Sequence, residues 1–149
     1  MVALAGCLAV GVVACGGDGT TSATSPVSAQ AWNATVARDS TQLGVAEQQT
    51  GHACSADKFA DACAQAVTTL RDDSAVMLHD LYNMTAPARF APAQAKFESA
   101  LQKFQQAATD SLEAIHDRSS AELASASTEG LASDALLSQA GQLVSSTAP

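Results

Sequence analysis

The chain has 149 residues, which leaves room for one compact domain once an amino-terminal leader is set aside. Hydrophobic residues make up 47% of the chain but aromatic residues only 4%, and this alanine-rich composition favours helices packed on helices over a sheet, which needs branched and aromatic side chains. The formal net charge of −8 repels phosphate groups, so nucleic acid is excluded as an expected partner.

The first element is an uncharged apolar run over residues 2–14 that ends at Cys15. It is shorter than the roughly 20 apolar residues of a membrane-spanning helix and suits the apolar region of a signal peptide. Its end, Val12-Val13-Ala14-Cys15, resembles the lipobox of bacterial lipoproteins, and the alanine-rich style resembles lipoproteins of actinobacterial type. The resemblance is confined to this leader. It implies a signal peptide over residues 1–14 and a lipid on Cys15, which becomes the first mature residue.

The leader departs from the lipobox pattern in two respects. No Lys or Arg precedes the apolar run, which leaves open a start codon farther upstream. The stretch Leu4-Ala5-Gly6-Cys7 also fits the lipobox letters, so Cys7 is an alternative anchor, although almost no apolar region precedes it. Signal peptides are cleaved after their apolar region, and this order favours Cys15.

Residues 15–27 are predicted to form a flexible, lipid-anchored linker, because Gly, Ser and Thr dominate and little in them builds a core. Residues 28–146 then form the folded domain. A first helix is predicted from Ala29 to near Gly51, and a second from after Ser55 to about Met84, because apolar residues recur there at helical spacing.

Two prolines in residues 85–92 predict a chain reversal, with Pro92 suited to the first turn of a third helix. A capping box at residues 119–122 predicts the start of a fourth helix, although Gly130 is equally compatible with the end of a longer third helix. The fourth helix is expected to bury an apolar stripe made of Leu123, Leu131, Leu136, Leu137, Leu143 and Val144. The predicted fold is an all-α, up-down antiparallel bundle of three to four helices.

Cys54 and Cys63 are the only cysteines of the predicted mature domain. Export would place them in an oxidising compartment, so we expect a disulfide between them. In one straight helix they would be about 13 Å apart along the axis, whereas a disulfide spans Cα atoms at most about 7 Å apart. Cys54 is therefore predicted to lie in the loop before the second helix and to fold back onto it.

Metal binding is the alternative use of these cysteines. The available ligands would be His52, Cys54, Cys63 and, for the fourth position, His79 or His116. Their spacing matches no closely paired zinc pattern, and oxidation of the two thiols would remove the site. Glu113 and His116 form a single Glu-x-x-His motif, whereas di-iron bundles use two. We therefore expect no metal and no cofactor.

The sequence contains no Gly-x-Ser-x-Gly turn, so no catalytic residue is assigned. We expect a non-enzymatic structural or protein-interaction module of the cell envelope. It would be anchored through Cys15 to the outer face of the cytoplasmic membrane, with an unidentified envelope protein as its partner. The alternative is a small-ligand or metal-binding lipoprotein, which reduced Cys54 and Cys63 or a polar cavity within the bundle would favour.

Overall fold

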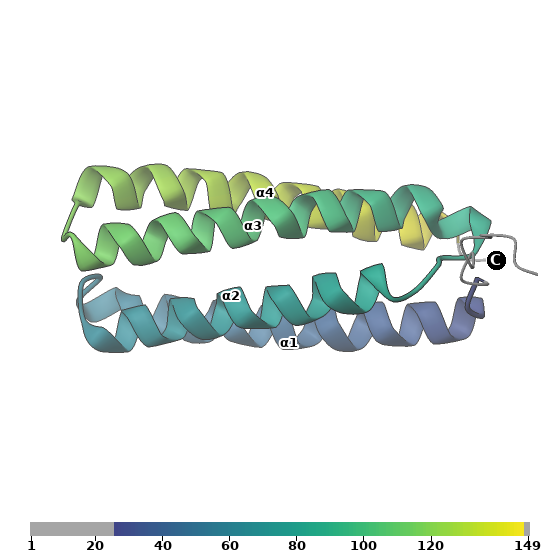
Figure 1. Cartoon of the computed structure of the whole chain (residues 1–149), viewed down its shortest axis with the longest axis horizontal. Coiled ribbons are helices and arrows are strands. Elements are labelled where there is room, and N and C mark those ends of the chain that lie inside the picture. The colour runs from purple at the N-terminus through teal and green to yellow at the C-terminus, as the bar shows by residue number, and fades with distance from the viewer. Residues whose placement is uncertain (1–25, 148–149) are drawn as a thin grey trace, which may run out of the picture.

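The computed structural model describes residues 26–147. These residues form the helices α1 (Ala29–Ala56), α2 (Asp61–Tyr82), α3 (Ala91–His116) and α4 (Ser120–Ser146), with a short 3-10 helix, η1 (Ala88–Phe90), just before α3. The helices run alternately up and down along one elongated bundle (Figure 1). The predicted all-α, antiparallel fold is confirmed, with four helices. None of the described helices is both long enough and apolar enough to cross a membrane.

Serine side chains mark the start of the first and last helices. Ser28 accepts a hydrogen bond from the Ala31 amide at 3.1 Å, and Ser119 accepts one from the Glu122 amide at 3.4 Å. Such caps satisfy amide groups that have no partner within the helix. The predicted cap at Ser119 is confirmed. Gly130 lies inside α4, so the alternative in which it ends a longer third helix is wrong.

The link between the first two helices differs from the prediction. Helix α1 continues past Gly51 to Ala56, and α2 begins only at Asp61. Gly51 is exposed, and a glycine in a helix weakens that helix by about 1 kcal/mol without ending it. The predicted helix end near Gly51 is wrong because no proline or capping residue stops the helix there.

Aromatic side chains fill the end of the bundle where α2 connects to α3. We call it the aromatic end and define it by Trp32, Phe90 and Phe97. Trp32 stacks on Phe90 with ring centroids 4.8 Å apart, and Phe97 lies against Trp32 at 6.4 Å. All three belong to the main hydrophobic core and are buried. Aromatic pairs of this kind add about 0.5–1.5 kcal/mol each beyond the burial of their area.

The Gln94 side chain fixes the connection between α2 and α3. Its oxygen accepts a hydrogen bond from the Ala86 amide at 2.9 Å, and its nitrogen donates to the carbonyls of Leu81 and Met84, both at 3.0 Å. The last carbonyls of a helix have no partner within it, and Leu81 lies in the last turn of α2. One glutamine side chain therefore supplies hydrogen-bond partners to backbone groups of the connection, which Pro87 keeps out of the helical conformation.

Helices α3 and α4 pack together through small side chains spaced seven residues apart. Those on the buried side of α3 are Ala93, Ala100, Ala107 and Ala114, and those of α4 are Ala126, Ser133 and Ala140. A seven-residue spacing keeps side chains on one face of a helix, and small side chains allow a short distance between helix axes. This pair is consequently the most extensively packed in the bundle.

The apolar stripe predicted for α4 is only partly correct: Leu123, Leu137, Leu143 and Val144 pack against the hydrophobic clusters, but none of the stripe is fully buried. Leu131 is 70% exposed, and the other leucines of α4 are only partly buried. The buried residues of α4 are instead its small ones, because they face the closely packed α3.

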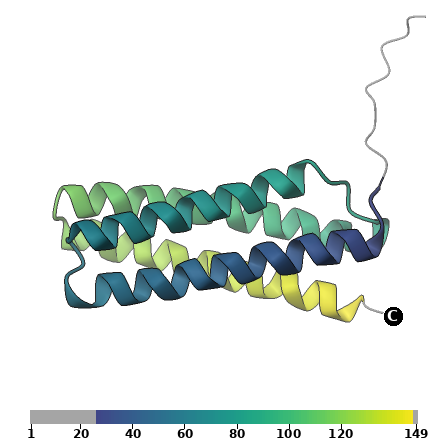
Figure 2. The same cartoon turned by 90° about the horizontal axis from the view of Figure 1, so that it is seen from below.

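The four helices do not pack equally around the bundle. Helix α1 packs on α2, α2 on α3 and α3 on α4, whereas the backbones of α1 and α4 hardly approach each other. We call the side of the bundle between α1 and α4 the α1–α4 seam. Figure 2 shows that the start of α1 and the end of α4 lie at the same end of the bundle, the aromatic end. The two tight turns, between α1 and α2 and between α3 and α4, lie at the other end.

Candidate functional site

The Cys54–Cys63 disulfide joins the last turn of α1 to the first turn of α2. The loop position predicted for Cys54 is wrong, since α1 extends beyond it. The two Cα atoms are 4.6 Å apart, which is possible because the two cysteines belong to different helices. Cys63 packs in a small hydrophobic cluster with Val67 and Ile115. We call this region the disulfide end and define it by these four residues.

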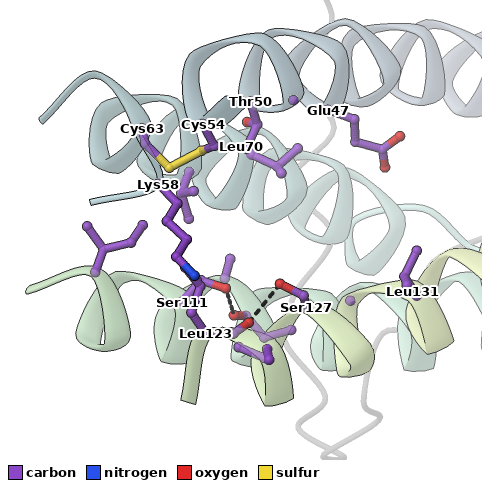
Figure 3. A pocket seen from close by; sticks show the side chains of 18 of the residues that line it. Glu47, Thr50, Cys54, Lys58, Cys63, Leu70, Ser111, Leu123, Ser127 and Leu131 are labelled. Carbon is purple, nitrogen blue, oxygen red and sulfur yellow. Dashed lines mark hydrogen bonds between the residues drawn. A yellow bond between two sulfur atoms is a disulfide. The ribbon is translucent and has the colours of Figure 1, made fainter. Parts of the chain in front are cut away.

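A cavity of about 600 Å³ lies at the disulfide end and opens on the α1–α4 seam. All four helices contribute to its wall, which is mostly apolar and includes the disulfide (Figure 3). Representative lining residues are Thr50, Leu70, Phe104, Ile115, Leu123 and Leu131. Small-molecule sites in proteins have volumes of roughly 300–1,000 Å³ and mostly apolar walls. The cavity has the size and lining of such a site.

Glycines on both sides of the α1–α4 seam leave space unfilled. Gly51 and Gly130 line the cavity, whereas Gly44 and Gly141 line a second hollow of about 400 Å³ farther along the seam. A Cβ atom at any of the four would have no neighbour within 4 Å. Glycine within a helix costs about 1 kcal/mol relative to alanine, so these positions forgo stability without allowing a closer approach of the helices. They leave without side-chain volume a seam that is already open at these positions.

Two carboxyl groups face the open seam, Glu47 from α1 and Asp134 from α4. Both line the cavity and the second hollow, so they lie where the two spaces meet. Neither forms an ion pair within residues 26–147. The Oδ1 atom of Asp134 is buried and has no hydrogen-bond partner in the described part of the chain. An unsatisfied buried oxygen of this kind is destabilising and calls for an explanation.

The surroundings of these acids disfavour their charged forms. Burial raises the pKa of Asp134. Burial also raises the pKa of Glu47, and the negative charge of Asp134 raises it further. Glu47 is therefore within reach of the charge of Asp134 across the seam, and a positive charge placed near the two acids would stabilise both in the ionised form.

Lys58 is the one basic residue that lines the cavity. It lies beside the disulfide, and its side chain points across the cavity toward Ser111 of α3, well separated from Glu47 (Figure 3). Its ammonium group is 5.2 Å from the centre of the Phe59 ring, and the residue is exposed. Lys58 thus contributes the positive charge of one end of the cavity, and the two acids contribute the negative charge of the other.

The structure does not assemble the other candidate residues into a site. His52, His79 and His116 lie exposed on three different helices. The disulfide uses both thiols that the metal hypothesis requires. Within residues 26–147, no group of three or more His, Cys, Asp or Glu side chains is placed to hold a metal ion.

The predicted lipid anchor lies outside the described residues. This holds for the signal peptide over residues 1–14, for Cys15 and the alternative Cys7, and for nearly all of the linker over residues 15–27.

Sequence analysis did not predict the cavity or the placement of Glu47 and Asp134 on its wall. The available signal was four glycines inside helical segments, at positions 44, 51, 130 and 141, together with the small residues repeated every seven positions on the third and fourth helices. Both features are positions with little or no side chain. A search for recurring apolar side chains does not detect such positions.

Comparison of the chain with known protein families, with characterised proteins and with solved structures gave no match. The cavity and its lining are therefore the basis for assigning a function.

Proposed function

We propose that the protein binds a small, mainly apolar molecule in the cavity at the disulfide end, without catalysing a reaction. The observation that carries this proposal is the cavity of about 600 Å³ with its apolar wall and its few polar groups. Neither feature that was expected to mark a ligand-binding lipoprotein is present in the described part of the chain, since Cys54 and Cys63 are joined and the cavity wall is mostly apolar. The existence and size of the cavity nevertheless favour small-ligand binding over a purely structural or protein-interaction role.

The energetics of packing support the same proposal. Apolar surface that an open cavity exposes to water costs stability, about 25 cal/mol for each Å² that burial would remove from water. The chain nevertheless places glycines along the seam, where an alanine at Gly130 would meet no neighbour. A bound molecule would recover the lost contacts and would stabilise the folded state in proportion to its concentration.

A neutral apolar dye provides a direct test. We expect N-phenyl-1-naphthylamine, whose fluorescence rises in apolar surroundings, to bind the purified chain with a stoichiometry of one. Gly130→Leu places a side chain in the cavity and should abolish this binding. Gly141→Leu is the matched control, because it lies on the same helix but lines only the second hollow.

The variants separate the two expected functions. Equal binding by the Gly130→Leu and Gly141→Leu chains would place the dye outside the cavity and would overturn the proposal. If the unaltered chain does not bind the dye, a structural or protein-interaction role becomes the favoured function.

We also propose that the protein is held at the outer face of the cytoplasmic membrane by a lipid on Cys15. The lipobox-like residues before Cys15 support this proposal. In the native bacterial host, Cys15→Ser should move the protein out of the membrane fraction and remove a diacylglyceryl mass, whereas Cys7→Ser should change neither. The opposite result would make Cys7 the anchor.

A further inference from the structure

The hydrogen-bonding groups of the cavity wall are acceptors with few donors. Four hydroxyl groups line the cavity, those of Thr50, Ser111, Ser120 and Ser127. Thr50 donates its proton to the Ala46 carbonyl at 2.9 Å, Ser111 to the Ala107 carbonyl at 2.8 Å and Ser127 to the Leu123 carbonyl at 2.7 Å. A hydroxyl has a single proton, so these three offer a ligand only lone pairs.

The two carboxyl groups extend this acceptor character and add charge. Glu47 and Asp134 have no cationic partner within the described residues, and one oxygen of Asp134 is both buried and free of hydrogen bonds. An ionised carboxylate only accepts hydrogen bonds. The group that complements this part of the cavity is therefore a hydrogen-bond donor with a positive charge.

We infer that the ligand is an organic cation, with an apolar body in the cavity and a protonated amine bound by Glu47 and Asp134. This inference rests on the proposed function and specifies its ligand class. The apolar body would contact side chains such as Phe104 and Leu70, which line the same cavity. Charge complementarity and the cavity volume are both those of a small amphiphilic amine, and a net charge of −8 attracts such a molecule to the protein.

Lys58 lies at the other end of the cavity and is exposed, so its charge is screened by solvent more than the charges of the acids are. Glu47 lies seven residues before Cys54 on α1, which is about 10 Å along the helix. An amine bound by the acids would thus be separated from the lysine by much of the length of the cavity.

The test compares three probes with the same ten-carbon tail: decylammonium, decanol and decanoate, each far below the concentration at which it forms micelles. We expect the purified chain to bind decylammonium at least about tenfold more tightly than decanol at about pH 7.5, because hydrogen bonds to charged groups are worth about that factor or more. Decanoate should bind more weakly than decanol. Isothermal titration calorimetry measures all three affinities.

Matched variants locate the charge effect. Glu47→Gln/Asp134→Asn should reduce the affinity for decylammonium to that for decanol and leave decanol binding unchanged. Glu113→Gln/Glu129→Gln removes the same net charge from exposed positions that do not line the cavity, and it should keep the tenfold preference. Lys58→Met should leave decylammonium binding unchanged or strengthen it.

The outcomes distinguish the inference from the function on which it rests. Equal binding of decanol and decylammonium, with both lost in Gly130→Leu, would overturn the cationic ligand and leave the apolar binding site standing. A preference for decylammonium that survives Glu47→Gln/Asp134→Asn would also overturn it, since the net charge would then be its source. Weakened decylammonium binding in Lys58→Met would place the polar end of the ligand at the lysine, against the inference. Failure of all three probes to bind would contradict the proposed function itself.

Discussion

The two ends of the bundle are built on opposite principles. The aromatic end is built on large side chains: Trp32, Phe90 and Phe97 occupy its centre, Gln94 holds the connection between α2 and α3, and only Phe97 also borders the second hollow. The disulfide end surrounds a cavity, its own hydrophobic cluster is small, and a covalent bond joins the two helices on one side of it. The same four helices run through both ends, so the difference lies in the side chains that each end presents.

This difference shows how a thin core can support a cavity. Close packing of α3 on α4 through alanines and the cross-link between α1 and α2 each hold one pair of helices together. The seam between the pairs then need not be filled at the disulfide end, because the aromatic end already supplies the main core between them. The main core and the cavity therefore lie toward different ends of one small domain.

The largest effect on stability is expected from removing a large side chain at the aromatic end. Trp32→Ala removes a fully buried indole and should destabilise the chain by about 3–5 kcal/mol, with a fall in melting temperature of more than about 10 °C. Ile115→Ala, at the disulfide end, should cost nearer 2 kcal/mol, because its side chain already borders empty space. Thermal unfolding followed by circular dichroism measures both. Equal losses would mean that the two ends contribute alike to stability.

Removal of the cross-link should come next in size. Cys54→Ala/Cys63→Ala reopens a loop with a sequence separation of 9, for which loop entropy gives about 3 kcal/mol. Chemical denaturation of this variant, beside the unaltered chain with and without a reducing agent, measures the loss. The denaturation midpoint of the unaltered chain should equal that of the variant only when a reducing agent is present. An unchanged midpoint in the variant would show that the disulfide end is held by packing alone.

A smaller effect of opposite sign is expected when the seam is partly filled. Gly130→Ala should stabilise the chain by about 0.5–1 kcal/mol, because the added methyl group meets no neighbour and alanine favours the helix. Gly141→Ala, in the second hollow, should give a similar gain. Destabilisation by Gly130→Ala would contradict the open space that the structure shows at this position.

The smallest effect is a dependence of stability on pH that arises at the seam. A carboxyl group whose pKa is higher in the folded than in the unfolded chain contributes stability that is complete below its ordinary pKa and is lost as the pH rises through the raised value. The pKa values of Glu47 and Asp134 are raised by burial, so the melting temperature should increase as the pH falls from about 7 toward about 4.5. Over the same pH range, the melting temperature of Glu47→Gln/Asp134→Asn should increase less than that of Glu113→Gln/Glu129→Gln, which carries the same net charge. Identical profiles for the two variants would exclude a contribution from the seam.

The fold was accessible from the sequence, whereas the cavity was not. The spacing of Phe97, Leu101 and Phe104 predicts an amphipathic helix, and Ser119 predicts the start of the next, because periodicity and capping are local properties of the chain. The burial of Ser133 and the exposure of Leu131 depend on how closely α3 approaches α4, which no local pattern specifies. Glu47 and Asp134 line the same cavity only through the arrangement of α1 and α4 in space, and their spacing in the sequence does not indicate it.

The start of α1 and the end of α4 both lie at the aromatic end, and this placement has a mechanical consequence. The chain enters α1 and leaves α4 at that end, and the disulfide end carries only two short turns (Figure 2). A pull on either terminus is therefore borne first by the densely packed end, some 40 Å of helix away from the far end of the bundle. A molecule held in the cavity would lie at the end of the bundle opposite to the one where that load enters.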